Sequence, residues 1–169
     1  AMLEPYEGEP DNRGIVVTGK EDLIQVVTKA SLAGFPCAVH AIGDRAVHEV
    51  LDAYEAVRRI EKDAGIAPKN RRHRIEHVQL IHPEDVRRLK RLGITASMQP
   101  IHATSDMYMA DTHWGKRAAY GYNWRTHLEQ GTNLAFGSDA PVESVNPFLG
   151  IHAAVTRRRV DGTPGPMGW

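Results

Sequence analysis

Three ionisable side chains stand at or just beyond the ends of short apolar runs that have the length and composition of β-strands. They are His40, His77 and Asp139. In parallel α/β folds the carboxyl ends of the strands meet at one edge of the sheet, so these side chains are expected to converge. Two imidazoles and one carboxylate form a donor set for zinc or a similar divalent ion, and also a general acid–base set.

The alternation of side chains along a strand bears on this grouping. In the first run Ala38 and His40 share one face, and in the fourth run small residues share the face of Asp139. In the second run Glu76 and His77 point to opposite faces. His77 is therefore preferred as the site residue, and Glu76 is expected to pair with a neighbouring arginine. On residue types alone, a metal site and a packing role for the histidines both remain open.

Strands alternate with helices along most of the chain. We expect strands at 37–40, 74–78, 94–99 and 134–137. We expect helices at 21–32, 45–63, 83–92, 123–130 and 147–158. A further short strand is expected at 15–18, and a long loop at 100–122. This order predicts a parallel sheet, either closed as a barrel or doubly wound, although a doubly wound nucleotide site would need a glycine-rich loop that is not found.

The predicted loop at 100–122 mixes aromatic and polar side chains, as ligand-binding loops do. We expect this region to set the choice of substrate. The residues singled out for contact with a substrate are Gln99, His102, Asp106 and Trp114. A hydrogen bond at the end of a strand accounts for Gln99 equally well. Asp44 is expected to cap the helix that begins beside it.

Four segments occur in an order that resembles the amidohydrolase superfamily. They are HAIGDRA (40–46), RIEHVQ (74–79), SMQP (97–100) and GSDAPV (137–142). The likeness is to the branch typified by N-substituted formamide deformylase, and it extends over nearly the whole chain. The resemblance implies an α/β fold in which about four βα units correspond to strands 5–8 of a partial TIM (β/α)8 barrel.

The resemblance also implies roles for single residues. His40 and His77 match the metal-ligand histidines that end the fifth and sixth strands of the family's barrel. Asp139 matches the aspartate that ends the eighth strand, which contacts metal and shuttles a proton. The implied cofactor is one or two divalent ions, commonly zinc. The implied reaction is hydrolysis of a C–N bond in an amide, formamide or related small molecule by metal-activated water.

The sequence departs from the family in one respect. It contains no His-x-His pair, which the family carries on its first strand, and it lacks the region that would hold the first four strands. We expect a single partial-barrel domain over 1–169, with a flexible arm at 1–14 and a tail at 161–169. Two functions stay open: a C–N hydrolase in the full-length form, and an inactive truncated fragment without metal that acts as a binding or assembly module.

The composition of the chain restricts the classes of partner and the cellular location that we expect. The chain has 21 basic and 21 acidic residues, so its formal net charge is zero, which argues against nucleic acid as a partner. No apolar stretch approaches the roughly 20 residues that a bilayer span needs. The single cysteine, Cys37, suits a reducing, cytoplasmic location. A half-barrel has two open sheet edges, so we expect a homo-oligomer that covers them, with a small molecule as substrate.

Overall fold

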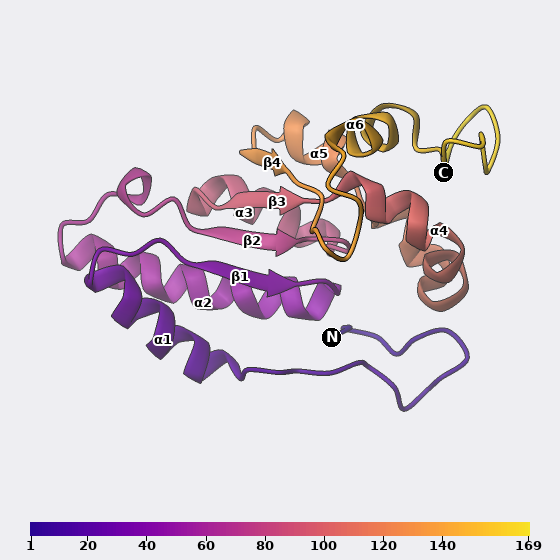
Figure 1. Ribbon diagram of the computed structural model, residues 1–169. Coiled ribbons are helices and arrows are strands. Elements are labelled where there is room, and N and C mark those ends of the chain that lie inside the picture. Colours follow the sequence, from indigo (N-terminus) through magenta and orange to yellow (C-terminus); the bar gives the residue numbers. More distant parts are fainter.

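A computed structural model describes residues 1–169 as a four-stranded parallel sheet with helices packed on one face (Figure 1). The strands are β1 (Ala38–Ala41), β2 (Arg74–His77), β3 (Thr95–Met98) and β4 (Leu134–Phe136). They lie side by side in the order of the sequence, and each neighbouring pair is parallel. The predicted α/β class with four βα units is confirmed. The sheet is open, so β1 and β4 each have a free edge.

Six helices accompany the strands. They are α1 (Lys20–Leu32), α2 (Asp44–Asp63), α3 (Val86–Leu92), α4 (Pro100–Trp114), α5 (Trp124–Glu129) and α6 (Pro147–Thr156). Short 3-10 turns lie at Pro68–Asn70, Pro83–Asp85 and Gly115–Tyr120. No helix of the protein combines the length and the apolar character that crossing a bilayer requires.

The apolar stripe of α2 forms the centre of the core. Its members recur at three- and four-residue intervals, as one face of a helix does. They are Val47, Val50, Leu51, Tyr54 and Val57, and all are buried. The Tyr54 hydroxyl donates hydrogen bonds to the carbonyl oxygens of Cys37 and Arg74, at 3.1 and 2.9 Å. These bonds fix α2 against the residues that lead into β1 and begin β2.

The two faces of the sheet differ in polarity. On the helix side, the core contains Ala41, Ile75, Ala96 and Met98. On the open side, the register places His40 beside Glu76, and Glu76 beside Ser97. Glu76 also accepts a hydrogen bond from Arg74 Nε at 2.5 Å, which confirms its predicted pairing with a neighbouring arginine.

The segment 100–122 is not the predicted loop. Most of it forms α4, a helix of 15 residues that begins with Pro100 at its first position. Proline fits there because the first turn of a helix needs no amide donor. The buried residues Ala103, Met107, Ala110 and Trp114 follow helical spacing. Polar residues between them hide this stripe in the sequence, and burial against the rest of the protein outweighs their low helix propensity.

The predicted strand at 15–18 is also wrong. Ile15 and Val17 are 81% and 93% exposed, and the segment pairs with no strand. It lies instead along an apolar groove of about 800 Å³ whose other walls are β1 and α1. β-branched residues favour extended backbone, but a strand also needs a partner edge, which this segment does not contact.

Residues 1–14 lie at the carboxyl edge of the sheet (Figure 1). Met2 is buried in the core, and the Leu3 amide donates a hydrogen bond to Asp44 Oδ1 at 2.8 Å. Asp44 is the first residue of α2. Its hydrogen bond with Leu3 attaches the N-terminal segment to this helix. The predicted N-cap role is wrong, because Gly43 occupies the cap position. A Cβ on Gly43 would clash with the carbonyl oxygen of Ala1, so this close approach requires glycine.

A buried polar network lies at the opposite, amino edge of the sheet. The Glu61 carboxylate accepts hydrogen bonds from Ser31 Oγ, from Arg58 Nη1 at 2.5 Å and from His73 Nε2 at 2.8 Å. His73 Nδ1 accepts the amide of Cys37 at 2.9 Å. This arrangement requires a neutral His73 ring with its proton on Nε2, and burial lowers the pKa of His73 accordingly. The network joins α1, α2 and the entries to β1 and β2.

The network also sets the ionisation of Glu61. Burial works to raise the pKa of this carboxyl, but the hydrogen bonds from Ser31, His73 and Arg58 outweigh it and hold the pKa below its usual range. The side chain of Arg58 is 7% exposed, so the positive charge of the guanidinium depends on Glu61 for compensation.

Replacing Glu61 with alanine should lower the free energy of unfolding by about 3–5 kcal/mol, because it leaves Arg58 buried without its counter-charge. Urea unfolding followed by circular dichroism measures the change. Glu129→Ala is the matched control, since Glu129 pairs with Arg125 on the surface of α5. An exposed pair contributes less than about 1 kcal/mol.

The stabilisation by Glu61 should also depend on pH. Because the folded-state pKa is lowered, the contribution is fully present above the unfolded value of about 4.3 and is lost as pH falls through the folded value. The difference in stability between wild type and Glu61→Ala should therefore be constant from pH 5 to pH 7 and shrink below about pH 4. A difference that grows on acidification would contradict this account.

Candidate metal centre

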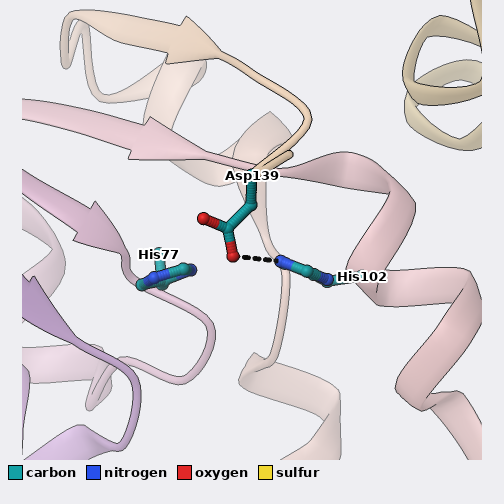
Figure 2. Close-up of side chains that lie close together, drawn as sticks. All are labelled: His77, His102 and Asp139. Carbon is teal, nitrogen blue, oxygen red and sulfur yellow. Dashed lines mark hydrogen bonds and ion pairs between the residues drawn. The ribbon is translucent and has the colours of Figure 1, made fainter. Parts of the chain in front are cut away.

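Three side chains converge at the carboxyl edge of the sheet. His77 ends β2, His102 lies in the first turn of α4 directly after β3, and Asp139 follows β4. One potential ligand atom from each of them lies within 4.8 Å of the others. Figure 2 shows the Asp139 carboxylate between the two imidazole rings. The convergence expected from parallel strands is therefore seen for His77 and Asp139, and it also includes His102.

His77 reaches this place through its backbone conformation. The pleat puts His77 on the side of Ile75, which is fully buried under the helices, whereas His40 lies on the side of Glu76. Glu76 and His77 thus point to opposite faces, as the alternation predicts, but His77 shares the face of the helices. At His77 and Val78 the backbone turns left-handed, with φ of 78° and 46°, and this redirects the chain at the strand end. Such strained conformations gather at functional sites.

His40 lies beside the three-residue group. Its ring centroid is 4.5 Å from that of His77, at an interplanar angle of 71°. The histidine is exposed on the open side of the sheet. The structure thus brings the predicted set of His40, His77 and Asp139 into one neighbourhood, while the tightest group contains His102 in place of His40.

His102 connects two carboxylates. Its Nε2 lies 3.2 Å from Asp139 Oδ2, and its Nδ1 lies 3.6 Å from Glu143 Oε1. The His102 side chain is 8% exposed, so its ring nitrogens face these carboxylates and have little contact with water. Asp139 has a left-handed φ of 59°, so it too is a strained residue at the site.

The donor atoms fit a divalent ion. His77 Nδ1 is buried and has no hydrogen-bond partner, which is uncommon for a polar atom inside a protein. Burial and the neighbouring His40 lower the pKa of His77, so its ring is neutral and has a lone pair available. Two imidazoles with one carboxylate match the ligand number and types of catalytic zinc sites. His77, His102 and Asp139 are the residues that could hold such an ion.

A cavity of about 550 Å³ opens beside these donors. His77, His102 and Glu143 line one part of it. Apolar side chains from the N-terminal segment, α4 and the loop after β4 line much of the rest; they include Met2, Tyr6, Met109, Trp114 and Val142. A concave, partly apolar space with a few polar groups at one end is typical of a small-molecule site.

The other residues predicted to bind substrate have structural contacts. Asp106 Oδ2 accepts a hydrogen bond from the Tyr122 hydroxyl at 2.6 Å, and Trp114 stacks on the Tyr122 ring at 6.0 Å. Both residues line the cavity, but these contacts anchor α4. Gln99 is buried, its Nε2 donates to Ser97 O at 3.4 Å, and its Oε1 lacks a partner.

Sequence reasoning missed Glu143 and the N-terminal wall of the cavity. Ser105 Oγ donates a hydrogen bond to Glu143 Oε1 at 2.6 Å. His102 and Ser105 are three residues apart, a spacing that puts them on one face of a helix. That signal was available in the sequence, but the prediction of a loop at 100–122 concealed it.

Comparisons with known proteins show the family of this chain. The model of the amidohydrolase family matches residues 1–167. A Bacillus subtilis protein named as an amidohydrolase, YtcJ, is 39% identical over 98% of this chain. The N-substituted formamide deformylase of Arthrobacter pascens is 26% identical over 97% of this chain. The chain covers 30% of the length of each of these relatives.

A solved structure shows the same arrangement of elements. The chain superposes on an uncharacterised metal-dependent hydrolase from Pyrococcus furiosus with a TM-score of 0.78 and 34% identity. The match covers 98% of this chain and 32% of that one. It confirms the predicted α/β class, since the open parallel sheet matches part of the fold of a metal-dependent hydrolase.

Asp106→Ala should lower the free energy of unfolding by about 1–3 kcal/mol, because it leaves the buried Tyr122 hydroxyl without its acceptor. Burial, followed by the neighbouring Asp106 carboxylate, raises the pKa of Tyr122, so this hydroxyl stays a donor across the working pH range. Thermal and urea unfolding measure the loss. The exposed Asp63→Ala is the control, and equal effects of the two variants would argue against an anchoring role.

Proposed function

Because this chain belongs to the amidohydrolase family, we propose that it provides half of the active site of a metal-dependent hydrolase that cleaves C–N bonds. The substrate class is a small amide, formamide or related molecule. The observation that carries this proposal is the convergence of His77, His102 and Asp139 within 4.8 Å at the carboxyl edge of the sheet. Because the chain covers about a third of the hydrolase structure that it matches, activity belongs to the larger protein.

The proposed cofactor is zinc, with one or two ions in the complete enzyme. Imidazole and carboxylate ligands are shared by several transition metals, and zinc is favoured by a set of two histidines and one carboxylate with an open position. The buried, unpartnered Nδ1 of His77 supports a metal ligand at this point. His40 lies within reach of the same region and completes the proposed group of ligands.

The residues of this chain would have separate roles in cleavage of the C–N bond. A divalent ion bound there would supply a water of lowered pKa and polarise the scissile carbonyl. Asp139 would accept the water's proton at its carboxylate and return it to the departing nitrogen, so that the amine leaves neutral. Before an ion binds, His102 Nε2 lies 3.2 Å from Asp139 Oδ2 and orients this carboxylate. The cavity walls would place the substrate and exclude part of the solvent.

Zinc titration calorimetry on the 169-residue chain tests the site directly. We expect about one equivalent to bind, and binding should be lost in His77→Ala and in Asp139→Ala, because each removes one ligand. His82→Ala is the control, since His82 caps the 3-10 turn Pro83–Asp85 and is not one of the three converging residues. Equal binding by the wild type and both site variants would contradict the proposal.

Two further variants separate the alternative ligand sets. If His40 is a ligand, as the resemblance implies, His40→Ala should weaken zinc binding at least tenfold. If the tightest group in the structure is the complete site, His102→Ala should do so and His40→Ala should have little effect. Cobalt substitution gives a second reading, because the visible spectrum reports the number and type of ligands.

A second candidate function, an assembly module without catalysis, is favoured by the open sheet. β1 and β4 both have free edges, and exposed apolar side chains accompany each of them. Ile15 and Val17 lie on the β1 side, and Phe148 and Ile151 lie in α6 on the β4 side. Free edges pair readily with other strands, so we propose that the isolated chain self-associates through them.

Light scattering over a wide range of concentrations tests this self-association. We expect an average mass above that of the monomer, and Val17→Lys should lower it because a charge is placed beside the β1 edge. Met167→Lys is the control, since Met167 and Val17 are both 93% exposed. A monodisperse monomer at every concentration would rule the proposal out.

A further inference from the structure

The loop between β4 and α6, residues 137–146, is held by α4. The loop contains no helix or strand, and its apolar members Val142 and Val145 are 71% and 77% exposed. Its side-chain hydrogen bonds and ion pairs with α4 come from Asp139 and Glu143. Packing therefore contributes little to the position of Asp139, and polar contacts contribute most of it.

Two residues of α4 make these contacts. His102 and Ser105 project from one face of the helix because they are three positions apart. His102 Nε2 lies 3.2 Å from Asp139 Oδ2, and Ser105 Oγ donates to Glu143 Oε1 at 2.6 Å. His102 Nδ1 also lies 3.6 Å from the same Glu143 oxygen. The four side chains form one connected set, which we call the α4 clamp.

We propose that Glu143 is a positioning residue that orients the His102 ring, so that its Nε2 faces Asp139 and the place where the three ligand atoms converge. The inference rests on the proposed metal-dependent function and deepens it. Glu143 itself lies outside the group of three converging ligand atoms. Its carboxylate is occupied by the Ser105 hydroxyl, and it faces the ring nitrogen of His102 that points away from Asp139.

The contacts explain why such a residue is needed. An imidazole with one bound nitrogen can still rotate about its side-chain bonds, whereas contacts at both nitrogens define its orientation. Carboxylates behind histidines do this in many metal sites and strengthen metal binding. Asp139 also has a strained left-handed backbone, which persists when its surroundings hold it in place. Ser105 in turn limits the movement of Glu143.

The first test is zinc affinity. Glu143→Ala should weaken binding by about 10–100-fold, although Glu143 is not a proposed ligand. Glu143→Gln keeps an oxygen that can accept the Ser105 hydroxyl and should restore most of the affinity. Ser105→Ala should weaken binding in the same direction, and Ser105→Ala with Glu143→Ala should cost less than the sum of the two, because both act through one contact. Glu129→Ala is the matched control.

The second test needs no metal. Hydrogen exchange of the amides in 137–146 should become faster in Glu143→Ala and stay near the wild-type rate in Glu143→Gln. The melting temperature should be nearly the same in all variants, because Glu143 lies in a loop outside the core. Faster exchange at constant global stability would assign the effect to the clamp.

The outcomes separate the two proposals. If the wild type binds no zinc, the proposed function fails for this chain. The hydrogen-exchange rates of residues 137–146 then test the positioning role of Glu143 by themselves. If zinc binds and Glu143→Ala changes neither affinity nor exchange, the positioning role is overturned and the metal site stands. Faster exchange with unchanged zinc affinity also overturns the role, since the loop would then move without consequence for Asp139.

Discussion

Parallel pairing brings the carboxyl ends of β1 to β4 to one edge, and the side chains of the candidate metal centre enter from that edge. Each strand is only three or four residues long, so the helices must hold the register that pairing alone would hold weakly. The contacts of Tyr54 and the buried Glu61 network do this at the amino edge. Stability and chemistry are thereby placed at opposite ends of the same strands, as is usual in βα barrels.

The sequence allowed much of the fold to be predicted, and the exceptions have physical causes. The stripe from Val47 to Val57 is regular and apolar, so α2 was predicted nearly to its ends. In α4 polar residues interrupt the buried stripe that includes Met107 and Trp114, and propensity alone favoured a loop. At 15–18 the propensity for strand is strong, but the structure offers no pairing partner. Intrinsic propensity predicts the right element where tertiary contacts favour the same element. It predicts the wrong one where tertiary contacts favour another.

The site was predictable to a smaller extent. Residue type and position at strand ends identified His77 and Asp139, because topology brings such ends together. The left-handed backbone at His77 could not be foreseen, because it depends on the surrounding contacts and not on the residue itself. His102 was predicted to contact substrate from a loop, but it lies on α4, which sets it against Asp139. Glu143 and Ser105 become visible only once that helix is known.

The polar open side of the sheet has a consequence for any strand that would pack against it. Arg74 and Glu76 form an ion pair there, with side chains 55% and 24% exposed, so water still hydrates them. If further strands close this sheet, as the proposed function implies, this pair would enter a crowded interior and lose that hydration, at a cost of several kcal/mol per ion. Closure must therefore provide new hydrogen bonds to Arg74 and Glu76 from the facing strands. Strands that complete this sheet would then need polar groups that match this ion pair, in addition to apolar area.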